Sequence, residues 1–344
     1  MSTLQIGMAI AGGLVLAGVV TYNTLSSRRN QPRQPEPGQP RIEPHSLGQD
    51  HALATEDLQD PDLILPPSLE KKPLMDSLID VIAAIMLDEP VSGDAVIQAM
   101  PSTRRVGSKP FAVEGLNSHT RKWESPEAGQ RYDMLQTGVQ LANRSGPLNE
   151  IEYSEFVVKA NALSDALGGT PDFPEMRDEV ARARELDGFA SDHDAQLTMN
   201  LKARHTAWSP GYVQQNAARL GFVPGVLPGR MVLPSSTPGL PSLLGLMYDA
   251  QAALSEDPDQ TAIHELVLNL EVAHVPRDER PYQRLRECVQ SLAQTMDGVV
   301  TDDDGHALNH DAMDQIGAEL ERLYDTLESR DMPAGSTLAR RLFS

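Results

Sequence analysis

Two stretches with strict alternation decide the fold class: AQLTMNLKA at residues 195–203 and ELVLNLEV at residues 265–272. Successive side chains of a strand point to opposite sides, so alternation is typical of a strand with one buried face. The apolar set comprises Leu197, Met199, Leu201, Leu266, Leu268, Leu270 and Val272. Helical patterns lie between and after these strands. The sequence therefore predicts a mixed α+β region whose helices cover the apolar side of a sheet.

The opposite side of the same strands is mostly polar, with Gln196, Thr198, Asn269 and Glu271. From these strands and their neighbours, we expect few apolar residues on this side: Met247, Val267, and either Leu227 or Met231. This is a small apolar area for a sheet face that would bind an apolar partner.

Helix signals complete this region, which we place at residues 193–330, with a tail at 331–344. Ser209 and Pro210 are typical of an N-cap and a first helical position. A long helix is predicted over 281–296 and closed by Gly298. A last helix is predicted from an Asn309 cap to about residue 329.

Residues 74–192 repeat this order of elements. A strand is predicted over 77–87, a short helix after Ser92, and a long helix over 151–167 that ends at Gly168. The two long helices align without a gap: Tyr153, Phe156, Ala160, Leu163, Leu167 and Gly169 correspond to Tyr282, Leu285, Val289, Leu292, Met296 and Gly298. This indicates a tandem duplication of one α/β module. The alternative is one larger α+β domain whose helices share a period by coincidence.

The strand SLIDVIAAIML at 77–87 is apolar on both faces, unlike the strands of the second region. One face contains Leu78, Ile82 and Met86. Such a strand is either buried on both sides, here against the second module, or leaves one face for a partner. In the second case Phe111 and Met134 would flank a peptide-binding groove, and methionine suits a surface that adapts its shape.

The N-terminal segment, residues 1–29, predicts a membrane anchor. Residues 4–22 form an apolar run of the length needed to cross a bilayer. A cleavable signal peptide is the alternative, but no basic residue precedes the run, whereas Arg28 and Arg29 follow it. Basic residues stay on the cytoplasmic side, so we expect the N-terminus outside and the bulk of the chain inside. Small residues at Ala9, Gly13 and Ala17 would allow two such helices to approach closely.

Residues 30–73 are rich in proline and glutamine and show no apolar period. This composition predicts a disordered tether with some polyproline II character.

Together, the anchor, the tether and the C-terminal module resemble the ZipA family of bacterial division proteins. The resemblance includes RLGFVPG at 219–225, LLGLMYDAQ at 243–251 and DGVVTDDDG at 297–305, in this order and spacing. It implies an antiparallel sheet with helices on one face, here as two tandem modules after one transmembrane helix. It also implies a position in the inner membrane at the division site, with a periplasmic N-terminus.

The resemblance further implies the partner: the C-terminal peptide of FtsZ, bound on the open face of the sheet. The tether is short for the family, and residues 74–189 are additional to its single module. The candidate peptide-binding residues are Leu78, Ile82, Met86, Phe111, Met134, Met231, Met247 and Val267. A rival hypothesis is a membrane-anchored sensor that binds a small ligand in a cleft between its two modules.

Several other functions are disfavoured. A net charge of −20 and an aromatic content of 4% argue against a nucleic-acid partner. Residues 301–311, TDDDGHALNHD, lack the spacing of a calcium loop, and a turn followed by the Asn309 cap explains them. Phosphate-binding glycine loops and nucleophile elbows are missing from the sequence, so we expect neither an enzyme nor a cofactor. The single cysteine, Cys288, fits a helix core.

Overall fold

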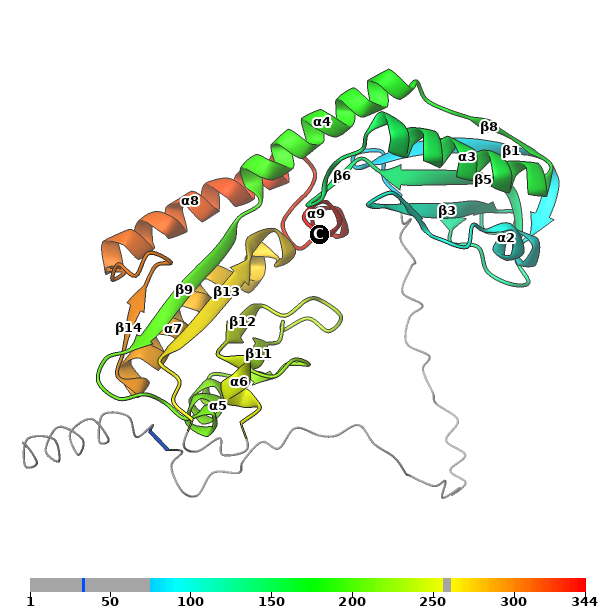
Figure 1. Ribbon diagram of the computed structural model, residues 1–344. Coiled ribbons are helices and arrows are strands. Elements are labelled where there is room, and N and C mark those ends of the chain that lie inside the picture. Colours follow the sequence, from blue (N-terminus) through cyan, green and yellow to red (C-terminus); the bar gives the residue numbers. More distant parts are fainter. Residues whose placement is uncertain (1–32, 35–74, 256–260) are drawn as a thin grey trace, which may run out of the picture. The chain divides into compact units, whose positions relative to one another are not determined.

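The computed structural model describes residues 33–34, 75–255 and 261–344, in two compact units. The first unit contains residues 75–194 and 337–344, and the second contains residues 33–34 and 195–336 apart from 256–260. Each unit has a six-stranded sheet whose neighbouring strands are antiparallel (Figure 1). The prediction of an α+β fold with antiparallel sheets is confirmed.

The first unit has the strand order β2-β3-β5-β1-β8, with β4 beside β3. Its strands are β1 (Asp80–Ser92), β2 (Arg105–Val106), β3 (Lys109–Asn117), β4 (Trp123–Glu124), β5 (Arg131–Gln140) and β8 (Gly169–Asp172). A small hairpin of β6 (Ala142–Asn143) and β7 (Gly146–Pro147) lies outside this sheet. Its main helices are α2 (Gly93–Ala99), α3 (Glu150–Leu167) and α4 (Met176–His193).

Helix α3 covers one face of the first sheet. Asn149 and Glu152 form a capping box at its start, and Gly168 ends it in the left-handed conformation. Phe156 is fully buried and packs on Phe111 of β3, with ring centroids 6.1 Å apart. The core of the first unit therefore lies between α3 and the sheet.

The second unit has the strand order β10-β11-β12-β13-β9-β14. Its strands are β9 (Gln196–Ala203), β10 (Val223–Pro224), β11 (Arg230–Leu233), β12 (Leu244–Met247), β13 (Glu265–Glu271) and β14 (Gly298–Thr301). Its helices are α5 (Pro210–Arg219), α6 (Ala250–Ala253), α7 (Pro281–Met296) and α8 (His310–Ser329), with short 3₁₀ turns η1 (Val272–His274) and η2 (Arg277–Glu279).

Helix α7 packs on the apolar side of the second sheet and buries Leu285, Val289, Leu292 and Cys288. The predicted caps Ser209 and Asn309 accept hydrogen bonds from the first turns of α5 and α8.

The predicted bounds of α7 are confirmed, but the residue that closes it is Asp297, which takes the left-handed conformation (φ +57°), and Gly298 begins β14. A Cβ at Gly298 would lie 2.6 Å from Leu201 Cδ1. The glycine therefore permits close packing of β14 on β9.

One predicted strand is shorter in the structure. The strand predicted over 77–87 begins only at Asp80. The Asp76 carboxylate accepts a hydrogen bond from the Leu78 amide and holds residues 77–79 in a turn. In the second unit, β10 and β11 are two short strands separated by a turn in which Gly229 has a φ of +72°.

The last residues of the chain belong to the first unit. Helix α9 (Thr337–Leu342) lies in the segment that the sequence indicates as a tail, yet Leu342 and Phe343 are buried. Arg341 pairs with Asp80 at the start of β1, and its carbonyl accepts a hydrogen bond from Gln140 Nε2 at 2.7 Å. The chain thus leaves the first unit after Asp194 and returns to it after Ser336.

The predicted anchor at 4–22, with Ala9, Gly13 and Ala17, lies outside the described residues, as does the tether apart from residues 33–34. Within the part of the chain that the structure describes, no helix combines the length and the apolarity that a membrane span needs.

Candidate peptide-binding face

The face of the first sheet opposite α3 is called its open face. It carries a continuous row of apolar side chains at the end that contains Met86 of β1. Directly paired residues of antiparallel strands point to the same side. The register therefore places Trp123, Leu116, Met134, Met86 and Thr170 side by side across five strands. Trp123, Leu116 and Met134 are partly exposed, and Met86 is 55% exposed. Four apolar side chains thus form a ridge that reaches solvent.

The next row is mostly polar, and its buried carboxylate is satisfied by hydrogen bonds within the first unit. It contains Glu114, Gln136, Ala84 and Asp172. The fully buried Glu114 accepts a hydrogen bond from Gln136 Nε2 at 2.8 Å and one from the Met75 amide at 3.4 Å. These bonds offset the cost of burying a carboxylate within an apolar surface.

The third row is partly covered by the chain itself. It contains Ala112, Gly138 and Ile82. Met75 lies against Gly138: a Cβ added to Gly138 would be only 2.3 Å from Met75 Sδ. A side chain at position 138 would therefore displace the segment that leads into β1.

The inner end of this face is closed by the C-terminal segment. Asp80 and Gln140 are paired there, and both are bound to Arg341 of α9. Asp80 is only 2% exposed. Burial raises the pKa of its carboxyl above the usual value, although the hydrogen bonds of Arg341 act to lower it. The surface open to a partner is therefore the end with Met86 and Met134.

The structure brings together three of the residues predicted for this site: Ile82, Met86 and Met134. Leu78 is 44% exposed but lies in the turn before β1. Placing Phe111 beside them was wrong, because it points to the other side of β3 and packs under α3. Leu116 and Trp123 were missed, although alternation along β3 from the inward Phe111 and Val113 indicates an outward Leu116.

The open face of the second sheet is polar, as the alternation predicts. One row contains Thr301, Asn200, Val267, Met247 and Arg230. Val267 and Met247 are partly exposed and adjacent. Met231 does not join them: it is 2% exposed and points to the helix side, because it pairs with the inward Leu246.

Two further polar features occupy that face. Lys202 and Glu265 are paired across β9 and β13, with Nζ and Oε1 3.7 Å apart. The loop after β14 lies over its other end, where Asp303 accepts hydrogen bonds from Thr198 and Asn200. The polar residues of β9 therefore bind structural neighbours: Lys202 pairs with β13, and Thr198 and Asn200 bind the loop after β14.

That loop also gathers three side chains of the kind that bind metals, namely Asp302, Asp304 and His306, whose ligand atoms lie within 4.8 Å of one another. Asp302 accepts a hydrogen bond from the His306 amide at 2.7 Å. Aspartate commonly bonds to nearby backbone amides in turns. Turn formation accounts for this arrangement.

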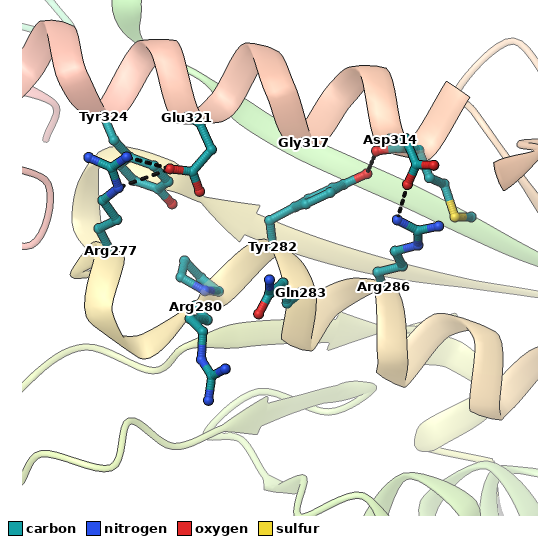
Figure 2. Close-up of a pocket in the computed structure, with 11 residues that line it drawn as sticks. Arg277, Arg280, Tyr282, Gln283, Arg286, Asp314, Gly317, Glu321 and Tyr324 are labelled. Atoms are coloured by element: carbon teal, nitrogen blue, oxygen red, sulfur yellow. Dashed lines mark hydrogen bonds and ion pairs between the residues drawn. The ribbon is translucent and has the colours of Figure 1, made fainter. Parts of the chain in front are cut away.

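A separate cavity of about 400 Å³ lies between α7 and α8 of the second unit (Figure 2). Arg277 contacts Glu321 at 2.5 Å and Asp325 at 2.9 Å, and Arg286 pairs with Asp314. These ion pairs use two of the arginines that line the cavity to connect α8 with η2 and α7. Two arginines that line the cavity therefore have a structural role, and they do not indicate a ligand site.

Comparison with known proteins adds no assignment: no family model matches the chain, and no curated protein matches it significantly.

Proposed function

We propose that this chain is a ZipA-like tether that binds the C-terminal peptide of FtsZ on the open face of its first sheet. The proposal includes an anchor in the bacterial inner membrane, a periplasmic N-terminus and a cytoplasmic bulk. The observation that carries it is the row of Trp123, Leu116, Met134 and Met86, which presents apolar side chains across four neighbouring strands. An extended apolar peptide fits such a face because it can place alternate side chains along it.

We also propose that the two units are a tandem duplication. The strand order β3-β5-β1-β8 has the same sequence of elements as β12-β13-β9-β14. In each unit the long helix is followed directly by the edge strand and then by another helix. The first residues of these edge strands, Gly169 and Gly298, both leave no room for a Cβ against the central strand.

The long helices support the same equivalence. Tyr153 and Tyr282 are both buried, and each hydroxyl donates to a backbone carbonyl near the start of the following helix, Pro174 and Met313 respectively. Phe156 and Leu285, the next aligned pair, are both fully buried.

The duplication allows the two open faces to be compared position by position. Gly169 pairs with Leu87 and Gly298 with Ala203, so Met86 corresponds to Lys202. Met86 pairs with Met134 and Lys202 with Glu265, so the methionine pair of the first sheet stands where the second sheet has an ion pair. This difference favours the first sheet as the apolar binding face.

The affinity expected from this face is modest. Fully burying a Met or Leu side chain contributes about 1.5–3 kcal/mol, and much of that is offset by ordering the peptide. Many copies on one membrane that meet a polymer with repeated tails would bind it strongly, because each further contact is intramolecular. The proposed mechanism is therefore avidity, without catalysis.

The test is a titration of the full chain with the FtsZ C-terminal peptide. We expect Ile82→Thr with Met86→Gln to weaken binding at least tenfold, since both side chains lie on the proposed face. The matched control, Val267→Thr with Met247→Gln on the second sheet, should change it less than twofold. Thermal melting of each variant checks that it remains folded.

Two results would contradict the proposal. Loss of binding in the control pair alone would place the peptide on the second sheet. Failure of the unaltered chain to bind the peptide would reject the tether itself.

A further inference from the structure

Residues 33–34 lie against the second unit, far in sequence from the elements they touch. The Arg33 amide donates to the Ala207 carbonyl at 2.7 Å, and the Arg33 carbonyl accepts from the Ser209 amide at 3.0 Å. This is a parallel bridge to Trp208, whose other edge pairs antiparallel with Ile263. Arg33 thus pairs with the second backbone edge of Trp208, as in β-augmentation.

The side chain of Arg33 adds a charged contact to these backbone bonds. Its Nη2 lies 3.2 Å from Asp297 Oδ2, and His205 Nδ1 lies 3.1 Å from the same oxygen. The hydrogen bond of His205 and the charges of His205 and Arg33 lower the pKa of Asp297. The Asp297 carboxylate therefore favours a basic residue at the position of Arg33 in any segment that pairs with Trp208.

Arg33 also pairs with a backbone group at the start of a helix of the second unit. Ser209 is fully buried, and its amide hydrogen bonds to the Arg33 carbonyl. Ser209 is also the N-cap of α5, and the neighbouring Trp208 is fully buried with its indole bonded to the Met296 carbonyl. The Arg33 carbonyl therefore supplies the backbone acceptor for the amide of the residue that caps α5.

We propose that Ala207–Ser209 and Asp297 form a docking site for an extended segment with a central arginine, and that Arg33 occupies it within the same chain. The docked segment would act as a latch that shortens the tether. This consequence rests on the proposed membrane anchor at residues 4–22.

The change in reach follows from chain length. Without the latch, residues 23–74 separate the predicted span from the first described residue of the first unit. A segment of this length reaches about 170 Å when fully extended. With the latch, only residues 23–32 separate the span from the second unit, and this segment reaches about 35 Å. A shorter connection confines the folded region to the membrane surface and raises its effective concentration there.

The test is hydrogen exchange of single amides in the full chain. Arg33→Pro removes both the amide donor and the guanidinium. We expect the Ser209 amide to exchange at least tenfold faster in this variant. The Trp208 amide, which donates to the Ile263 carbonyl at 2.9 Å, should keep its rate and serves as the internal control.

The chain offers a matched control variant. Residues 39–41 repeat the tripeptide QPR of residues 31–33, so Arg41→Pro makes the same change outside the proposed contact. This variant should leave the Ser209 amide unchanged. Asp297→Asn keeps a residue that tolerates the left-handed conformation. It should raise the Ser209 rate by no more than about fivefold, since the ion pair is partly exposed.

Three outcomes would overturn the latch. These are an unchanged Ser209 rate in Arg33→Pro, faster exchange in Arg41→Pro instead, or equal acceleration of Ser209 and Trp208. The measurement reports the exchange of single amides, and its result depends on neither the membrane orientation nor the binding of the FtsZ peptide. The latch and the proposed tether function can therefore fail independently.

Discussion

Replacing Arg341 with Met should destabilise the first unit strongly and in a pH-dependent way. The Arg341 guanidinium contacts the Asp80 carboxylate at 2.5 and 3.0 Å, and Asp80 is 2% exposed. Methionine keeps most of the apolar packing but removes the charge. Leaving one member of a buried ion pair without its partner typically costs about 3–5 kcal/mol.

The free-energy cost of leaving Asp80 charged and unpaired has an upper limit, which is set by the cost of protonating its carboxyl. Asp80 can avoid an unpaired buried charge by taking up a proton, which costs about 1.4 kcal/mol for each pH unit above its ordinary value of 3.8. At pH 7 this limit is about 4.4 kcal/mol, and at pH 5 it is about 1.6 kcal/mol. We therefore expect a loss of about 3–4 kcal/mol at pH 7, or a Tm lower by on the order of 10 °C.

The sign of the pH dependence follows from proton binding. Arg341 acts to lower the pKa of folded Asp80, so its removal raises this pKa further above the unfolded value than in the parent. Stability relative to the parent therefore falls as pH rises from about 4 to 7. Denaturant unfolding of the first unit at pH 5 and pH 7 measures this difference. Asp80→Asn combined with Arg341→Met should recover most of the loss.

Arg340→Met provides the control, because Arg340 makes no ion pair among the described residues. It should change stability by less than about 0.5 kcal/mol. A deficit below about 1 kcal/mol in Arg341→Met, or one that is the same at both pH values, would show that the buried pair does not hold α9 to the first unit.

Two further predictions concern the cores. Phe156→Ala and Leu285→Ala should each cost about 2–5 kcal/mol in chemical denaturation of their own unit, since both side chains are fully buried. The proposed duplication makes these two positions equivalent, and a loss near zero at either would refute that equivalence. Gly298→Ala should cost about 1–3 kcal/mol in the same assay because its Cβ meets Leu201, whereas Gly188→Ala, which has open space on α4, should be neutral or slightly stabilising. Equal effects at the two glycines would contradict the crowding at β14.

The local parts of the fold were predictable from sequence. Caps such as Ser92, Ser209 and Asn309 act within one helical turn, so a few residues suffice to recognise them. The alternation of β9 and β13 likewise identifies the inward face of each strand directly.

Features that depend on long-range pairing were not predictable. Met231 and Phe111 were assigned to open faces, because the facing of a strand depends on its register with partners distant in sequence. Arg33 and Trp208 lie far apart in the chain, and no sequence pattern near either residue predicts their contact. The return of α9 to the first unit through Arg341 and Asp80 is a third case.

The polar residues on the open faces of the two sheets have different roles, and this difference suggests that the two units have different functions. On the second sheet, Thr198 and Asn200 bind the loop at Asp303, so replacing them with apolar residues would release that loop. On the first sheet, the polar residue Glu114 is buried and satisfied by its own neighbours, which leaves the apolar row at Met86 unobstructed. If the units are duplicates, selection for packing would conserve their helix-facing sides while the open faces diverge. The proposed outcome is one unit that binds the partner peptide and another that is latched to the chain by Arg33.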